Sequence, residues 1–329
     1  MAGTPGSAST PWICLSLRQE RAGQVLRPRP CHNLRLCIGT NAALTRSGSA
    51  PYSRAMTAVL TVDSHAHVFT RNMPLAAARR YAPDYDATPA EYLSLLDTHG
   101  ISHGVLVQPS FLGHDNSYLL SVLRQQPRRL RGVVMLEPAT TEWELAALAA
   151  EGVTGVRLNL VGQPLPDLAL PSWQAFLARI RALDWHLELY REAADLPVLL
   201  AATARSGCRI VVDHFGRPDA VQASRDPGFA ALLRHADSGR VWVKLSAAYR
   251  NASGNPDADA TAARECARQL LAAFGPQRLV WGSDWPHTQH QHLADYGVSF
   301  AALADWVPDT AQRREILGAT AAELFHIPQ

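Results

Sequence analysis

From Val59 to the C-terminus, short β-branched runs alternate with longer amphipathic segments, and this alternation restricts the possible folds more than any other feature. The predicted strands are Leu60–His67, Ser102–Gln108, Gly132–Glu137, Gly155–Leu160, His186–Tyr190, Arg209–His214, Val241–Leu245 and Leu279–Gly282. The predicted helices are Pro89–His99, Asn116–Gln125, Glu142–Glu151, Ser172–Leu183, Leu196–Arg205, Gly228–Ala236, Ala258–Phe274 and Tyr296–Trp306, with a tail helix at Gln312–Phe325. Eight such pairs in roughly 270 residues predict an α/β fold, the (β/α)8 TIM barrel. A doubly wound open sheet is the alternative, but no glycine-rich fingerprint follows the first strand.

Helix ends carry their own local signals. Thr88 is placed as an N-cap, Pro89 occupies the first turn, and Gly100 follows the last turn of the same predicted helix. The segment Ser172–Leu183 repeats apolar residues at spacings of three and four, as a helix with one buried face does. These signals support the reading of parallel strands separated by covering helices.

Residues 1–55 differ from the rest of the chain. They hold seven arginines and one acid, Glu20, so about +6 of charge lies here and about −4 remains for the body, out of a net +2. They are rich in serine, proline and arginine and show no periodicity. We expect this segment to be disordered or to precede a true start at Met56, with an arginine-rich transit peptide as the alternative. Residues 56–329 then form a single barrel domain.

Composition indicates which kinds of partner and which cellular compartment to expect. A mildly acidic body does not suggest nucleic-acid binding, and no long apolar run predicts a membrane span. The body keeps only Cys208 and Cys266, which predicts no disulfide framework and a reducing, cytoplasmic compartment. The expected partner is a small molecule, and the sequence carries no signal for an oligomeric state.

Reactive side chains stand at the ends of most predicted strands. They are His65 and His67 on the first strand, Ser110 after the second, Arg157 on the fourth, Tyr190 on the fifth, His214 and Arg217 around the end of the sixth, Arg250 after the seventh, and Asp284 and His287 after the eighth. A single histidine or arginine is usually structural. Active sites of (β/α)8 barrels lie at the carboxyl ends of the strands, so this convergence predicts an active site there.

Three motifs carry a family resemblance. "DSHAH" at 63–67, "DHFGRP" at 213–218 and "WGSDWPH" at 281–287 resemble the amidohydrolase superfamily, in its amidohydrolase family 2 of TIM-barrel hydrolases. Together with "KLSAAYR" at 244–250, they look most like the branch that contains 2-pyrone-4,6-dicarboxylate lactonase and sugar-lactone hydrolases. The resemblance runs from Val59 to the C-terminus. It implies a hydrolase that opens a small carboxylated lactone, of the kind formed in aromatic degradation.

The resemblance leaves the metal question open. Metal-dependent members bind one or two divalent ions, and the matching ligands here are His65, His67, His214 and Asp284, for one Zn²⁺ or Mn²⁺. Tyr190 stands where those members place a histidine, as in the lactonase that works without metal. We therefore expect no cofactor, with a mononuclear metal site as the alternative.

The resemblance and the residue types together suggest a mechanism. Asp284 is the expected general base for water, with a pKa raised by its low-dielectric surroundings. The three histidines His65, His67 and His214 are expected to polarise the lactone carbonyl, and Tyr190 to donate a hydrogen bond to the substrate. The expected substrate-binding residues are Arg157, Arg217, Arg250, Ser110 and His287. Three arginines near one cavity need anionic partners, so we expect a small anionic substrate, with Tyr81 or Tyr85 reaching in from the loop 69–88.

Three other functions fit parts of the pattern. A sugar-lactone or aldarate-lactone hydrolase or isomerase needs fewer arginines. A metal-dependent amidohydrolase or decarboxylase needs a bound ion. A catalytically inactive binding barrel needs the acid or the histidines to be missing, and Asp284, His65 and His67 are present.

Overall fold

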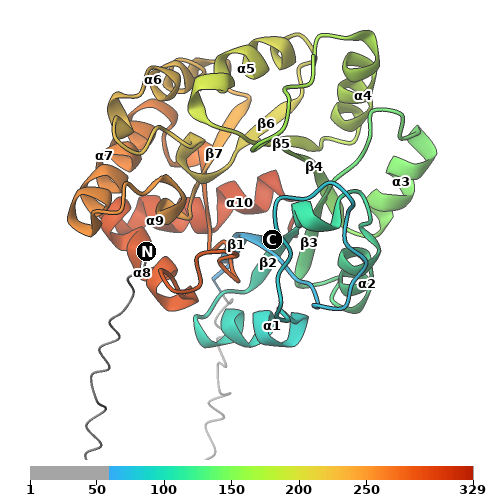
Figure 1. The fold of residues 1–329 in the computed structure, drawn as a ribbon, viewed down its shortest axis with the longest axis horizontal. Coiled ribbons are helices and arrows are strands. Elements are labelled where there is room, and N and C mark those ends of the chain that lie inside the picture. The colour runs from blue at the N-terminus through green and yellow to red at the C-terminus, as the bar shows by residue number, and fades with distance from the viewer. Residues whose placement is uncertain (1–58, 329) are drawn as a thin grey trace, which may run out of the picture. The chain divides into compact units, whose positions relative to one another are not determined.

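The computed structural model describes residues 59–328, and in this part eight parallel strands form a nearly closed barrel in sequential order (Figure 1). The strands are β1 Val62–Ala66, β2 His103–Val107, β3 Leu130–Val134, β4 Val153–Asn159, β5 His186–Tyr190, β6 Arg209–Val212, β7 Val241–Ser246 and β8 Leu279–Gly282. The ring is completed beyond the end of β8, where the Asp284 amide donates to the His65 carbonyl at 2.8 Å and Ala66 bridges Trp285. The predicted (β/α)8 barrel is confirmed. The predictions for residues 1–55 and for a start at Met56 lie outside the described residues.

Helices surround the strands in Figure 1. They are α1 Pro89–Thr98, α2 Ser117–Gln125, α3 Glu142–Ala150, α4 Pro171–Ala182, α5 Leu196–Ala204, α6 Pro227–Leu233, α7 Pro256–Phe274, α8 Tyr296–Trp306, α9 Thr310–Leu317 and α10 Ala319–Leu324. Across residues 59–328, none of these helices combines the length and the apolar character that a membrane crossing requires.

The start of α1 shows why the sequence folds as it does locally. The Thr88 side chain accepts from the Glu91 amide, and the Glu91 carboxylate accepts from the Thr88 amide at 2.8 Å. This capping box satisfies two amides that the first helical turn leaves without partners. The predicted start of α1 is confirmed, and the helix ends at Thr98, one residue before the predicted end, with Gly100 at a φ of +67° just beyond it.

Strand β3 ends earlier than the sequence pattern predicts, at Val134 instead of Glu137. The side chain of Asn116 explains the difference. Its amide group accepts from the Met135 amide at 3.1 Å and donates to the Met135 carbonyl at 2.9 Å. Because a side chain takes the place of the neighbouring strand, the sheet ladder stops there.

The tail helix is a further departure, since the predicted Gln312–Phe325 is broken into α9 and α10 at Gly318. Gly318 has a φ of −109° and a ψ of −95°, which no helix continues through. A Cβ at this position would lie 2.7 Å from the Arg314 carbonyl oxygen and 3.0 Å from that of Leu60. Glycine therefore lets the chain turn against the residue that precedes β1.

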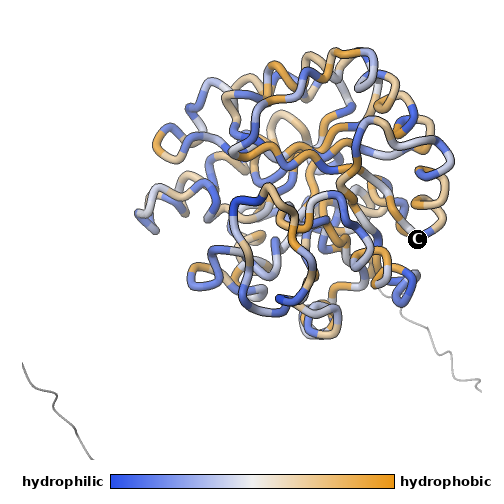
Figure 2. Tube along the Cα trace, turned by 45° about the vertical axis from the view of Figure 1, so that its right-hand side comes forward, coloured by the Kyte–Doolittle hydropathy of each residue, from blue (hydrophilic) through white to orange (hydrophobic). Residues whose placement is uncertain are grey.

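The break sends α10 across the amino-terminal end of the barrel. Its Ala321, Ala322 and Leu324, with Phe325 just beyond, pack on inward-facing strand residues such as Val62 and Val211. A larger apolar core lies between the strands and the outer helices, and in Figure 2 orange dominates the central strands. One end of the barrel is thus closed by apolar packing, and polar side chains are left to the other end.

Candidate active site

Contacts between β1 and the turn after β8 position Asp284. Asp63, on β1, accepts from the Ser283 amide at 2.8 Å and from the Ser283 hydroxyl at 2.6 Å. The same carboxylate accepts from the His65 amide at 3.2 Å. Asp284 follows directly, with a φ of +60° in the left-handed region. This backbone conformation is strained for a residue with a side chain, and the Asp63 bonds hold it in place.

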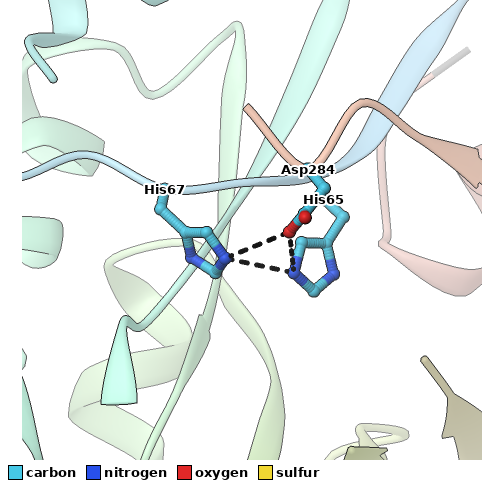
Figure 3. A group of neighbouring side chains, drawn as sticks. All are labelled: His65, His67 and Asp284. Atoms are coloured by element: carbon cyan, nitrogen blue, oxygen red, sulfur yellow. Dashed lines mark hydrogen bonds and ion pairs between the residues drawn. The ribbon is translucent and has the colours of Figure 1, made fainter. Parts of the chain in front are cut away.

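His65, His67 and Asp284 converge on one point, as Figure 3 shows. His65 lies on β1, His67 follows directly after the end of that strand, and the acid comes from the turn after β8. Oδ1 of Asp284 lies 3.6 Å from Nε2 of His65 and 3.6 Å from Nε2 of His67. Nε2 of His214 lies 3.9 Å from the same oxygen. The structure therefore brings these four residues together at the carboxyl ends of the strands, where the sequence places them.

The two oxygens of Asp284 have different surroundings. Oδ2 accepts from the Tyr249 hydroxyl at 2.5 Å and from Nε of Arg250 at 2.7 Å. Oδ1 forms no hydrogen bond with any described residue, although it is fully buried. One oxygen is thus fixed, and the other is free to receive a proton.

The expected rise in the pKa of Asp284 is wrong. Burial alone would raise it, but the Arg250 guanidinium and the neighbouring histidines hold the pKa well below its usual range. Arg250 stands 34 residues earlier in the chain, so the sequence does not show that it pairs with the acid. Asp284 is consequently a carboxylate at every pH near neutrality.

His214 reaches the cluster through an unusual backbone. Strand β6 ends at Val212, and residues 214–217 all have positive φ, between 51° and 78°. This conformation costs roughly 1–2 kcal/mol for each residue that is not glycine. At Gly216 a Cβ would lie 2.4 Å from Cδ2 of Leu232. The turn aims the His214 ring at Asp284, and Nδ1 of His214 lies 2.8 Å from the Ser246 hydroxyl. Burial lowers the pKa of His214 to about 3, so the ring is neutral.

Hydrogen bonding sets the tautomer of His67. Its Nδ1 lies 2.7 Å from the carbonyl oxygen of Val107. A carbonyl only accepts, so Nδ1 carries the hydrogen and Nε2 of neutral His67 presents a lone pair to the cluster. The expectation that all three histidines donate to a substrate carbonyl therefore changes at His67, which in its neutral form accepts.

The three arginines differ in a way the sequence does not reveal. Arg157 is buried, and its guanidinium lies 2.9 Å from Oδ2 of Asp213 and 3.1 Å from Oε1 of Glu188. Arg250 pairs with Asp284. Arg217 is more open: it donates to the Tyr190 hydroxyl at 2.9 Å and lies 3.9 Å from Glu192. Arg157 already has two anionic partners, so the argument that it needs a substrate carboxylate does not hold.

A narrow cavity opens in front of Asp284. Its lining includes His67, Arg80, Tyr81, Ser110, Arg157, Asn159, Tyr190, His214, Arg250 and Asp284. An adjoining hollow shares Arg80, Ser110 and Asn159 with it and leads outward beside the loop 69–88. Tyr81, not Tyr85, is the tyrosine that reaches the cavity from that loop. His287 does not line the cavity, because it lies beside Tyr249, 3.1 Å from the tyrosine hydroxyl.

The sequence reasoning considered Glu188 only as a substitute for the missing histidine ligand on the fifth strand, and it gave no role to several other residues that hold this site. Tyr249 lies next to Arg250 in the motif at 244–250, and Asp213 lies next to His214 in the motif at 213–218. Their positions in the sequence alone could have suggested a role in the site. Lys244 and Glu188 face the barrel interior, where Nζ of Lys244 makes a very short contact to the Glu188 carboxylate. Their pairing depends on strands that are distant in sequence, so only the closed barrel reveals it.

Two sets of side chains in the site could offer ligands to a divalent metal. The sets His65, His67, Asp284 and His65, Asp213, His214 each bring three possible ligand atoms within 4.8 Å of one another. A histidine that binds metal normally donates from its other nitrogen to a carbonyl or a carboxylate. His67 meets this condition at Val107, but Nδ1 of His65 lies 2.9 Å from the ammonium group of Lys244. His65, which belongs to both sets, does not fit.

A barrel with histidines and an acid at the carboxyl ends of its strands is the architecture of a (β/α)8 enzyme. The family model described as amidohydrolase matches residues 62–327. The chain is 33% identical to a 2-pyrone-4,6-dicarboxylate hydrolase of Comamonas testosteroni, over 78% of this chain and 85% of that protein. It is 33% identical to a 4-sulfomuconolactone hydrolase of Rhizobium radiobacter, over 86% and 95%. A solved structure from Pseudomonas putida, provisionally assigned as a 2-pyrone-4,6-dicarboxylic acid hydrolase, is 49% identical with a TM-score of 0.78, over 82% of this chain and 99% of that one.

The chain belongs to the amidohydrolase family. The match covers the whole described barrel, and the family predicted from the three motifs is therefore confirmed. The names of the two curated relatives above describe them as hydrolases, one of 2-pyrone-4,6-dicarboxylate and one of 4-sulfomuconolactone.

Proposed function

We propose that this chain hydrolyses a small carboxylated lactone of the 2-pyrone-4,6-dicarboxylate type, without a metal. One observation carries the proposal: a buried carboxylate whose Oδ2 is fixed and whose Oδ1 has no hydrogen-bond partner among residues 59–328, facing imidazole nitrogens at 3.6–3.9 Å. The names of two relatives, both hydrolases of small anionic lactones, agree with it.

The chemistry follows from the residues. Oδ1 of Asp284 takes a proton from water as the water oxygen bonds to the lactone carbonyl carbon. The carbonyl oxygen becomes an oxyanion, which N–H groups of His65 and His214 stabilise. The intermediate then collapses, the ring C–O bond breaks, and Asp284 returns its proton to the leaving oxygen. A lactone with two carboxylates and one water thus give an open-chain product with a third carboxyl group, which becomes a carboxylate when it releases its proton to solvent.

Three cationic or hydroxyl side chains fit the substrate's carboxylates. Arg217 is the arginine with the least internal compensation, and its side chain is 24% exposed. Its planar guanidinium can bind a carboxylate through two hydrogen bonds. The Tyr190 hydroxyl accepts from Arg217, so its own hydrogen is free to donate to the substrate. Ser110 also lines the cavity and offers a further donor.

The proposal of metal-free catalysis rests on two residues. Tyr190 stands at the end of β5, where metal-dependent relatives of this architecture are expected to place a histidine ligand. His65 has an ammonium group at Nδ1, where a metal ligand needs an acceptor. We also propose a cytoplasmic location, which the buried free thiols of Cys208 and Cys266 support.

The test is turnover of 2-pyrone-4,6-dicarboxylate with a product heavier by one water, measured by mass spectrometry. Asp284→Asn, which keeps the shape of the side chain, should lower kcat by about 100-fold to 10,000-fold. Its circular dichroism spectrum should match the wild type. Retained turnover in this variant would remove Asp284 as the base. Turnover of a sugar lactone alone, unaffected by Arg217→Met, would support the sugar-lactone alternative.

A further inference from the structure

Lys244 is the only lysine in the chain, and it lies at the centre of the barrel with no exposed surface. The sequence has 31 lysines and arginines, so every other one of them is an arginine. The folded protein uses arginine wherever a cation faces solvent or a surface carboxylate. A lysine at this one buried position indicates a requirement that a planar guanidinium does not meet.

Lys244 belongs to a charged ring that we define as Arg157, Glu188, Asp213 and Lys244. Arg157 lies 2.9 Å from Asp213 and 3.1 Å from Glu188. Lys244 makes a very short contact to Glu188 and lies 3.5 Å from Asp213. All four side chains are buried, and the ring is neutral overall only if Lys244 carries its proton. An ammonium has three N–H donors, and Lys244 has three partners: these two carboxylates and His65.

The third partner is the one that matters for catalysis. Nζ of Lys244 lies 2.9 Å from Nδ1 of His65. An ammonium cannot accept a hydrogen bond, so Nδ1 of His65 must be the acceptor. Because Nδ1 accepts and carries no hydrogen, the imidazole ring of His65 is neutral and has one hydrogen. That hydrogen is on Nε2, which points into the cluster.

The neighbouring contacts agree with this direction. Nε2 of His65 lies 3.3 Å from Nε2 of His67, which presents a lone pair because its Nδ1 donates to Val107. The bonds therefore run one way, from Lys244 to His65 to His67 to the Val107 carbonyl. His65 and His67, two residues apart, thus hold opposite tautomers.

We propose that Lys244 is a positioning residue that fixes His65 as a hydrogen-bond donor at Nε2, and that it thereby excludes a divalent metal from the histidine pair. A metal would need the lone pair that this hydrogen occupies, whereas a developing oxyanion needs the hydrogen. The proposal rests on the proposed lactone hydrolysis for its purpose. Its test does not depend on lactone hydrolysis, since the tautomer of His65 exists without substrate.

Removing the ammonium should release the opposite tautomer. Oδ1 of Asp213 lies 3.4 Å from Nδ1 of His65 and is the acceptor left when Lys244 is gone. His65 would then donate from Nδ1 to a carboxylate and present a lone pair at Nε2, as metal-binding histidines do. The paired change Lys244→Met with Glu188→Gln removes one cation and one anion, so the ring stays neutral. The matched control, Arg157→Met with Glu188→Gln, makes the same charge change and leaves Lys244 beside His65.

The first experiment is nitrogen NMR on the wild-type protein. Lysine labelling with ¹⁵N gives a single side-chain signal, because there is one lysine, and we expect an ammonium. Histidine ring labelling, with His65 and His67 assigned by single His→Gln variants, should show the hydrogen on Nε2 of His65 and on Nδ1 of His67. A neutral amine at Lys244, or a hydrogen on Nδ1 of both rings, would overturn the proposal.

Zinc affinity is the second readout. In the lysine pair variant we expect His65 to change tautomer and Zn²⁺ to bind at least about tenfold more tightly than in the wild type, measured by competition with a chelator. The arginine pair control should keep the wild-type tautomer and affinity. An equal gain in zinc affinity in both pairs would overturn the role of Lys244. If the lysine pair does not fold, the wild-type spectra alone decide. A wild type that opens no lactone would refute the proposed function and leave these spectra unaffected.

Discussion

Replacing Arg157 should destabilise the protein strongly and replacing Arg217 should leave its stability almost unchanged, although the sequence makes the two arginines look equivalent. Arg157→Met removes a buried cation that compensates Asp213 and Glu188 at 2.9 Å and 3.1 Å. The remaining ring has two carboxylates and only Lys244 to balance them. Removing one partner of a buried ion pair costs about 3–5 kcal/mol, because a charge is left uncompensated. Arg217→Met removes a side chain that is 24% exposed and whose nearest carboxylate is 3.9 Å away.

The magnitudes are far enough apart to measure. One kcal/mol shifts Tm by roughly 2–4 °C in a domain of this size, so Arg157→Met should lower Tm by about 10 °C. Arg217→Met should change stability by less than about 0.5 kcal/mol. It should lower kcat/KM for 2-pyrone-4,6-dicarboxylate by roughly 10-fold to 100-fold, since hydrogen bonds to a charged group are worth about 1.5–3 kcal/mol.

Thermal unfolding followed by circular dichroism, with kinetics on the same preparations, makes the comparison. Arg250 serves as a poor control because it contacts Asp284, so the comparison is restricted to Arg157 and Arg217. An unchanged Tm in Arg157→Met would refute the reasoning that the charged ring is a compensated unit. A large loss of stability in Arg217→Met would refute its assignment to the substrate.

Further predictions concern Asp284, its support by Asp63, and the turn at Gly318. Wild-type kcat/KM should be constant from about pH 5 to pH 8, because the pKa of Asp284 is held low and the active form is the carboxylate. Arg250→Met removes the main cause of that low pKa, so the acid limb should move to higher pH, and an unmoved limb would show that Arg250 does not control Asp284. Asp63→Asn disturbs the bonds to Ser283 and should lower kcat by roughly 100-fold through misplacement of Asp284, with KM little changed. Gly318→Ala brings a Cβ within 2.7 Å of the Arg314 carbonyl oxygen and should destabilise by about 1–3 kcal/mol in denaturant titration; a neutral effect would contradict the tight turn.

Local pattern was enough to predict the barrel. Strand β5 and strand β8 have the predicted bounds, and the capping box at Thr88 begins α1 where the sequence places it. The observed ends of elements differ from the predicted ones where a contact with a residue distant in the sequence determines them. Asn116 ends β3 by bonding Met135, and the Leu60 carbonyl requires a glycine between α9 and α10.

The site follows the same division. The positions of His65, His67, His214 and Asp284 could be predicted, because the ends of parallel strands meet in any barrel of this type. Their protonation could not, since it depends on contacts across the barrel. Lys244 sets the tautomer of His65, and the Val107 carbonyl sets the tautomer of His67. Arg250 lowers the pKa of Asp284.

Metal-free opening of a carboxylated lactone at Asp284 can be tested in one assay. The most direct measurement takes wild-type protein treated with chelator, confirms by elemental analysis that zinc and manganese are gone, and follows loss of the ultraviolet absorbance of 2-pyrone-4,6-dicarboxylate. Rapid loss at the rate of the untreated protein is the predicted result. No loss until Zn²⁺ or Mn²⁺ is restored would contradict the claim and would return His65 and His67 to the role of metal ligands.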